Sequence, residues 1–209
     1  MLALTLLVLA AFVPVLHEGD AVPAIPLVDQ SGHAFSLQSL RGNAVVVSFI
    51  YTRCADARMC PLVSAKFARM QQAIGTDPIR LVTLTLDPSY DTPAVLRRYG
   101  AGYAQDRGRW ILGTGAPASL EELATRFGIA TARTAPGQVV HTEAAAVLDR
   151  EGRVARIVDG NAWTPDDMLA LARDAAGVSQ TRGAMGTVRL WLTSAVALCG
   201  AGSTSFNGL

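Results

Sequence analysis

The chain has 209 residues, of which 50% are hydrophobic and 17% are charged, and its formal net charge is +1. This length and apolar content support one globular domain with a sizeable core. Lys66 is the only lysine, and the arginines are spread along the chain without a dense basic run, so nucleic-acid binding is not indicated. Three cysteines are too few for a disulfide scaffold but enough for one functional pair.

The beginning of the chain indicates export. Residues 1–16 are almost wholly apolar and are followed at once by the polar residues His17, Glu18 and Asp20. Such a segment is typical of an export signal or anchor, although it is shorter than the roughly 20 residues that span a bilayer. We therefore predict an apolar export or anchor segment over residues 1–20, with a buried N-terminal helix as the alternative. The expected location is the periplasm or the outer face of the cytoplasmic membrane, with membrane association through this segment.

The following residues alternate between strand and helix patterns. A turn at residues 29–32 joins two short extended pieces, which predicts a small N-terminal hairpin within residues 24–36. Residues 44–51 are a continuous β-branched and aromatic run, typical of a strand buried on both faces. From Pro61 the apolar residues recur at helical spacing, so a helix begins here and Cys60 lies at or beside its N-cap.

The same alternation continues through the middle of the chain. Residues 79–86 predict a second buried strand, and Asp91-Thr92-Pro93 supplies a cap for the next helix. Trp110-Ile111-Leu112 indicates a short strand, and Ser119-Leu120-Glu121-Glu122 has the pattern of a capping box that opens a further helix. Residues 133–138 are rich in turn formers and are predicted to form a surface loop.

The last elements complete an α/β pattern. Residues 143–148 and 154–158 flank a turn and predict a late hairpin, and Thr164 caps a final helix. A βαβ core followed by a hairpin favours a single-domain, thioredoxin-like α/β fold over residues 21–177. Residues 178–209 are predicted to be a linker and a short apolar C-terminal tail.

The thiols of Cys54 and Cys60 follow the first buried strand and precede the first long helix. They cannot share one face of a regular helix, because six positions at about 100° each place them roughly 240° apart. Residues 55–59 must therefore form a loop. Unpaired N–H groups at the helix N-terminus favour thiolate, and Arg53 and Arg58 add positive charge, so we expect lowered thiol pKa values. Such a pair can close a disulfide or hold a soft metal ion.

His141 is the histidine that opens a later strand pattern, within residues 139–149. Two thiolates and one imidazole make a ligand set suited to copper or zinc. A histidine that only hydrogen-bonds to the backbone, and a simple disulfide or two unrelated buried cysteines, are the structural alternatives. Neither His17 nor His33 is expected near the thiol loop.

Three further side chains are candidates for supporting the site. Asp56 or Met59 can approach a metal ion held by the loop, although each is expected to face solvent or to pack. Asp87 ends a strand whose carboxyl edge should face the loop. It is expected either to orient a ligand or Arg53, or to cap the turn into the next helix.

Three segments carry a resemblance to a known family. They are Phe49 to Cys54 with Cys60-Pro61, then Leu84 to Pro93, then Val140-His141-Thr142 with Leu148 to Gly152. Together they resemble the SCO/SenC family over roughly residues 24–175. The family's usual pattern is Cys-x-x-x-Cys-Pro, so the cysteines of this chain are more widely spaced.

The resemblance implies a thioredoxin fold that is tethered to a membrane and acts as a copper chaperone. Cys54, Cys60 and His141 then inherit the roles of ligands for Cu(I) or Cu(II). The implied task is to help metallate the CuA centre of cytochrome c oxidase, with an oxidase subunit or another copper protein as the partner. A metallochaperone of this kind is not an enzyme that turns over a small substrate.

The rival function is a thiol–disulfide oxidoreductase or a peroxidase-like protein of the same fold. A peroxidase site of the pattern P-x-x-x-T-x-x-C is not present, because Val47 and Tyr51 occupy the proline and threonine positions. A thioredoxin site would have C-x-x-C and a later proline where His141 stands. Redox work by the pair of Cys54 and Cys60 stays open as an accompanying role. A docking module stabilised by the disulfide would not need His141.

Overall fold

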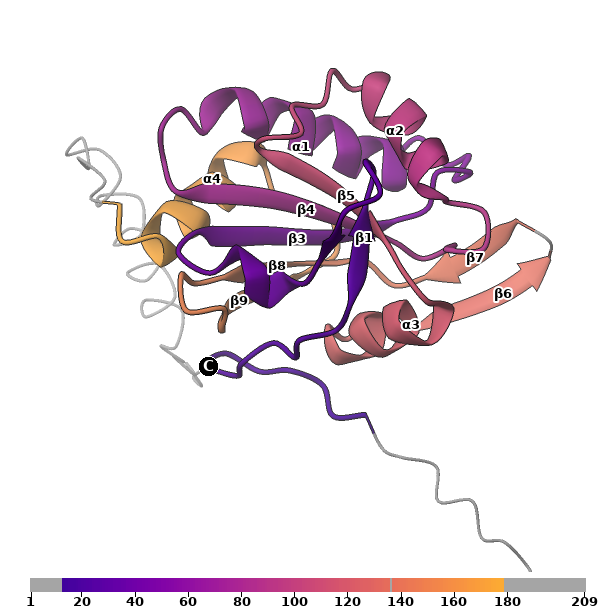
Figure 1. The fold of residues 1–209 in the computed structure, drawn as a ribbon, viewed down its shortest axis with the longest axis horizontal. Helices are drawn as coiled ribbons and strands as arrows, with labels where there is room; N and C mark the ends of the chain where they lie inside the picture. Colours follow the sequence, from indigo (N-terminus) through magenta and orange to yellow (C-terminus); the bar gives the residue numbers. More distant parts are fainter. Residues whose placement is uncertain (1–12, 136, 179–209) are drawn as a thin grey trace, which may run out of the picture. The chain divides into compact units, whose positions relative to one another are not determined.

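The computed structural model describes residues 13–135 and 137–178 (Figure 1). Residues 1–12 of the predicted export segment and the tail predicted after residue 178 lie outside the described residues. None of the helices in the described part has the length and hydropathy that a bilayer crossing requires. The helices are α1 (Cys60–Ala73), α2 (Pro93–Ala101), α3 (Pro117–Arg126) and α4 (Pro165–Ala175), with a 3-10 helix at Leu37–Leu40.

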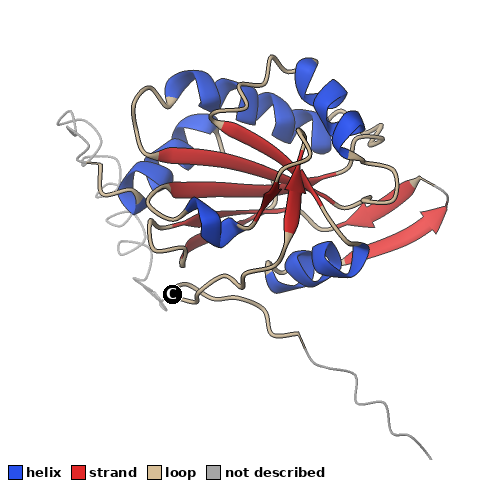
Figure 2. Cartoon of the chain, viewed as in Figure 1, coloured by secondary structure: helices blue, strands red, loops and turns tan. Residues whose placement is uncertain are grey.

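The strands form one large sheet and one separate hairpin (Figure 2). In the order β2-β1-β5-β4-β3-β8-β9, the large sheet contains β1 (Leu27–Asp29), β2 (Ala34–Phe35), β3 (Ala44–Ile50), β4 (Ile79–Thr85), β5 (Trp110–Thr114), β8 (Ala144–Leu148) and β9 (Val154–Asp159). The hairpin consists of β6 (Thr131–Ala135) and β7 (Gln138–His141). Parallel pairing of β3, β4 and β5, joined to the antiparallel β8–β9 pair and α4, confirms the predicted thioredoxin-like α/β fold with an early and a late hairpin.

The two central strands align their carboxyl ends. Every residue of β3 is buried, as its β-branched run predicts, and the parallel register runs from Ala44 opposite Ile79 to Ile50 opposite Thr85. Because both strands end at the same sheet edge, the loops that follow them lie side by side. Figure 1 shows the β6–β7 hairpin at this same edge. Three segments distant in sequence therefore meet there.

The helices α1 and α4 pack against each other and against β3. Thr164 caps α4 through a capping box with Asp167, and Thr92 caps α2, as the sequence predicts. The third helix differs from the prediction. It begins at Pro117 with Ala116 as its N-cap and no side-chain cap, so the predicted capping box at residues 119–122 is wrong. Pro117, with its fixed φ, starts the helix before Ser119 is reached.

The core beneath α1 is organised around Phe67, which is fully buried. Its ring centroid lies 5.7 Å from that of Trp110 and 6.3 Å from that of Trp163. We expect Phe67→Ala to lower the free energy of unfolding by about 3–5 kcal/mol, because it removes buried contacts and leaves a cavity. Gln72→Ala, on the exposed side of the same helix, should change it by less than about 0.5 kcal/mol. Denaturant melts of both variants measure this difference, and equal melts would contradict it.

The segment predicted as a surface loop at residues 133–138 is instead part of the β6–β7 hairpin. All five residues of β6 are exposed, so no apolar alternation marks the strand in the sequence. Backbone pairing with β7 creates the strand, from Thr131 opposite His141 to Ala135 opposite Gln138. The prediction of a loop was therefore wrong, and the hairpin proves to be the element that carries His141.

Candidate functional site

The two cysteines lie at opposite ends of one loop, as the helical geometry requires. Cys54 follows β3 after a turn that its N–H closes by donating to the carbonyl of Tyr51 at 3.2 Å. A second turn is closed by Met59 N–H and the carbonyl of Asp56 at 3.1 Å, and Cys60 then begins α1. Both thiols are free, but Cys60 is buried whereas Cys54 is half-buried. The loop thus presents one inner and one outer sulfur.

His141 is buried and is the last residue of β7. The prediction that it opens a strand is therefore wrong, because it ends one. Its Nε2 lies 3.8 Å from Sγ of Cys60, across 81 positions of sequence. Nδ1 lies 2.8 Å from the carbonyl oxygen of Thr142 and therefore carries the proton that it donates to this acceptor. The lone pair of Nε2 is then directed to the sulfur, as in metal-binding histidines whose other nitrogen is held by a carbonyl.

The residue after the histidine fixes the strand end. Thr142 donates its N–H to the carbonyl of Ala130 at 3.0 Å, and its hydroxyl accepts the N–H of Ala130 at 3.0 Å. These bonds join the end of β7 to the residue that precedes β6. The carbonyl that holds the imidazole of His141 therefore belongs to a residue that is itself fixed to the other strand of the hairpin.

Cys54 stands at the outer side of this pair. Its Sγ contacts the carbonyl of Asp56 at 3.9 Å. Within residues 13–135 and 137–178, no three His, Cys, Asp or Glu side chains are gathered closely enough to hold a metal ion. The structure thus brings Cys60 and His141 together, and the half-buried Cys54 lies close enough to interact with the side chains of Cys60 and Tyr51.

The pKa of the Cys60 thiol is raised, chiefly because the group is buried. A backbone hydrogen bond at Tyr51 lowers this pKa, and the neighbouring Cys54 and Glu143 raise it further. The expectation of a lowered pKa for this thiol is therefore wrong. The sequence correctly places Cys60 at the N-terminus of α1, but it does not show that the side chain turns into the core, where loss of hydration outweighs the helix dipole.

Tyr51 forms one wall of the site. Its side chain is buried, and its ring meets the imidazole of His141 edge to face, with 6.0 Å between the ring centroids. Burial raises the pKa of Tyr51, and the neighbouring Cys54 raises it further. The phenol is thus neutral and shields the inner sulfur and imidazole from water.

An ionic cluster joins the cysteine loop to the hairpin. The buried carboxylate of Asp87 accepts hydrogen bonds from Arg53 and from Arg133, the latter at 3.2 Å. Arg53 also lies 4.0 Å from the ring centroid of Tyr90. A Cβ atom at Gly137, whose φ is +80°, would come within 2.8 Å of the Arg53 guanidinium, so glycine allows the hairpin tip to approach it. The interpretation that Asp87 orients Arg53 agrees with this geometry.

The far end of the cysteine loop is held by the only lysine. The ammonium group of Lys66 donates to the carbonyls of Asn161 and Trp163 and lies 4.7 Å from the Trp163 ring centroid. The side-chain amide of Asn161 donates to the carbonyl of Arg58 at 2.8 Å. A chain of contacts therefore runs from α1 to the residues just before Cys60.

The side chains of the remaining candidates have other roles. Met59 is half-buried, and its N–H closes the turn on Asp56. Asp56 is exposed, and its carboxylate accepts the N–H of Arg58 at 2.9 Å. This bond stabilises the turn within the cysteine loop. His17 and His33 are largely exposed, as expected, and each pairs with a nearby aspartate. Sequence reasoning missed Arg133, because its partner is 46 positions away and no local pattern signals the pairing.

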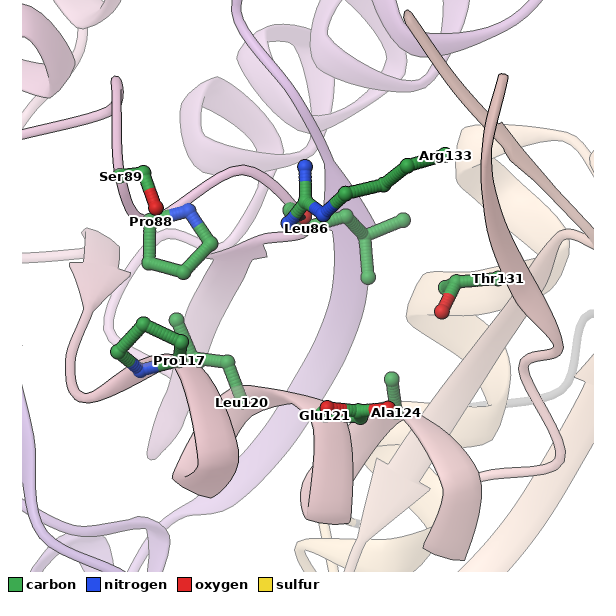
Figure 3. A pocket seen from close by; sticks show the side chains of 9 residues that line it. All are labelled: Leu86, Pro88, Ser89, Pro117, Leu120, Glu121, Ala124, Thr131 and Arg133. Carbon is green, nitrogen blue, oxygen red and sulfur yellow. Dashed lines mark hydrogen bonds between the residues drawn. The ribbon is translucent and has the colours of Figure 1, made fainter. Parts of the chain in front are cut away.

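A separate pocket of about 310 Å³ lies beside this cluster (Figure 3). Figure 3 shows Arg133 reaching over it opposite the residues of α3. The residues that line it are Leu86, Pro88, Ser89, Pro117, Leu120, Glu121, Ala124, Thr131 and Arg133. None of them is a cysteine or a histidine, so this hollow is distinct from the thiol site.

Comparison with known proteins agrees with the geometry. A model of the SCO1/SenC family matches residues 17–176. The SCO1 protein homolog of Bacillus subtilis (strain 168) is 28% identical over 154 residues, which cover 71% of this chain and 79% of that protein. Bradyrhizobium japonicum ScoI, solved with copper bound, is 25% identical with a TM-score of 0.61, over 76% of this chain and 99% of that one. BsSco, described as a member of the Sco family of cytochrome c oxidase assembly proteins with a disulfide switch, is 25% identical with a TM-score of 0.64, over 79% and 97%.

Proposed function

Because the chain belongs to the SCO1/SenC family, we propose that it binds copper through Cys54, Cys60 and His141 and supplies it during the assembly of cytochrome c oxidase. The observation that carries the proposal is the approach of the Cys60 sulfur to Nε2 of His141 at 3.8 Å. The copper bound to ScoI and the oxidase assembly role stated for BsSco support it.

The donor atoms suit copper as a cargo. Soft thiolate sulfur selects Cu(I), and the imidazole suits either oxidation state. Cys60 and His141 offer a half-formed, buried site, and Cys54 closes it from the loop. Since burial keeps the Cys60 thiol protonated, binding copper displaces its proton into solvent.

The unequal exposure of the ligands gives a route for release. Cys54 is the ligand that a recipient protein can replace first, because it lies on the exposed loop while Cys60 and His141 are buried. Copper then passes by stepwise exchange of ligands to a partner with more or better-placed donors. We propose that the recipient is the CuA centre of the oxidase, and that the protein is exported and works at the outer face of the membrane.

Thiol–disulfide exchange as the main function is not favoured. A thiol that exchanges readily needs a lowered pKa, whereas burial raises the pKa of Cys60. A buried imidazole with its lone pair directed to a sulfur is also a metal-ligand arrangement, which thiol exchange does not require.

Titration of the full, reduced chain with Cu(I) tests the proposal. We expect one tightly bound Cu(I) per chain, measured by metal analysis after gel filtration. The same stoichiometry is expected for Cys199→Ser, which removes the thiol of the C-terminal segment and serves as the control. A reduced protein that retains no copper would refute the proposal. Transfer to a copper-free CuA domain, followed by its absorption spectrum, then tests the recipient.

A further inference from the structure

The carboxylate of Asp91 is fully buried beneath the turn that presents Cys54. One oxygen, Oδ2, accepts the backbone N–H of Thr52 at 3.1 Å and the hydroxyl of Thr85 at 2.5 Å. The other oxygen, Oδ1, accepts the hydroxyl of Thr52. One side chain therefore connects the ends of two neighbouring strands, and two of its three bonds go to Thr52.

Thr52 is a corner of the turn that delivers the outer cysteine. The pairing of β3 with β4 ends where Leu86 N–H donates to the carbonyl of Ile50 at 2.7 Å. Beyond that point the chain turns, and Cys54 N–H closes the turn on Tyr51. The hydrogen bonds between β3 and β4 end at Ile50, and Asp91 then accepts the N–H of Thr52. The carboxylate thus supplies an acceptor for a backbone N–H that lies beyond the sheet.

The chemistry of the position calls for an ionised carboxylate. Three donors converge on it, and a carboxylate accepts at about four lone-pair sites without donating. Burial raises the pKa of Asp91, whereas the bonds from Thr52 and Thr85 counteract that rise. An amide of the same shape has one acceptor oxygen and no negative charge, so it loses the charge-assisted bonds that the carboxylate makes to these donors.

We propose that Asp91 is a positioning residue that fixes Cys54, through Thr52, where it can join Cys60 and His141. The inference rests on the proposed function in that copper retention is its main consequence. It goes beyond helix capping, because Thr92 is the residue that caps α2 and Asp91 turns to the cysteine loop. The carboxylate of Asp91 bonds to Thr52 and Thr85 and not to a sulfur, so it acts through the turn.

Two substitutions separate positioning from plain stabilisation. D91N weakens the support of Thr52 and Thr85 together. Thr85→Val removes a buried bond to the same carboxylate, and also the acceptor of the Asp87 N–H at 2.9 Å, but it leaves both bonds to Thr52. It therefore controls for the loss of buried hydrogen bonds outside the cysteine turn. Thr52→Val deletes the bond from the Thr52 hydroxyl to Asp91 and keeps the bond from the Thr52 N–H. It replaces D91N as the test variant if D91N does not fold.

We expect the dissociation constant for Cu(I), measured on the full reduced chain by competition with a chromophoric chelator, to rise about 10–100-fold in D91N, the range known for supporting residues of metal sites. Thr52→Val should show a smaller rise, and Thr85→Val should leave the constant near the wild-type value although its thermal midpoint falls. An unchanged constant in D91N and Thr52→Val, or equal weakening in Thr85→Val, would overturn the inference.

A second experiment, without copper, tests the role of Asp91 independently of the proposed function. The reduced proteins are mixed with oxidised glutathione, and each Cys54–Cys60 disulfide formed converts one oxidised glutathione into two reduced molecules. We expect D91N to form the intramolecular disulfide more slowly than Thr85→Val. If wild type binds no Cu(I), the proposed function fails, and this rate alone decides on Asp91: equal rates in the two variants would refute its positioning role.

Discussion

Replacing His141 with alanine should weaken the binding of Cu(I) by more than about 100-fold. Loss of an outer-shell partner already costs about 10–100-fold in metal affinity, and His141 is proposed to be a direct ligand. Its Nε2 faces the Cys60 sulfur at 3.8 Å, with Nδ1 fixed by the carbonyl of Thr142. Removing the ring leaves two sulfurs without the nitrogen donor. Competition with a Cu(I) chelator, on the full reduced chain, measures the change.

The matched control is His33→Ala. His33 is exposed and pairs with Asp29 at 3.4 Å, far in sequence from the thiol loop, so its loss should leave the copper affinity unchanged. Reduction of insulin by the thiols should be largely retained in His141→Ala, because thiol exchange does not use the imidazole. Equal copper affinities in wild type and His141→Ala would remove the metal hypothesis and leave redox chemistry as the better reading of the pair.

Oxidising Cys54 and Cys60 to a disulfide should abolish Cu(I) binding. Copper needs thiolates, and a disulfide leaves His141 as the remaining donor of the proposed set. Both cysteines are free, and they share one loop whose residues 55–58 are exposed. The expected stoichiometry falls from one copper per chain to none, and reduction with a thiol should restore it. Intact mass spectrometry, before and after alkylation, confirms the oxidation state of each sample.

The Cys199→Ser variant is the appropriate background, because it excludes disulfides with the third cysteine. Cys54→Ser provides the comparison that lacks the pair: it cannot form the disulfide, so the oxidant should leave its weaker copper binding unaltered. Stoichiometric copper on the fully oxidised protein would show that the thiols are not ligands. A disulfide that will not form would show that the two sulfurs cannot meet.

The elements that could be predicted from sequence are those with strong local signals. The β-branched run of β3 is buried at every position, and the helical period after Pro61 marks α1. The loop between the thiols follows from helix geometry alone. The late hairpin follows from its turn residues. In each case a short stretch of residues contains the whole reason for the structure.

The features that could not be predicted depend on partners far along the chain. Strand β6 has no buried face, so only its pairing with β7 makes it a strand. The depth of Cys60 results from the packing of α1 on the sheet, and this depth reverses the direction expected for its pKa. Arg133 meets Asp87 only because the hairpin lies at the carboxyl edge of β4.

The ammonium group of Lys66 shows why a chain that otherwise uses arginine for its cations keeps one primary amine. Two carbonyl oxygens and an indole face converge on that nitrogen, an arrangement suited to a compact tetrahedral donor. A planar guanidinium spreads its N–H bonds in a flat fork, so it cannot direct them from one nitrogen to both carbonyls in the way the ammonium does. Exchanging the two cations here would therefore loosen Asn161 and, through it, the carbonyl of Arg58, two residues before Cys60.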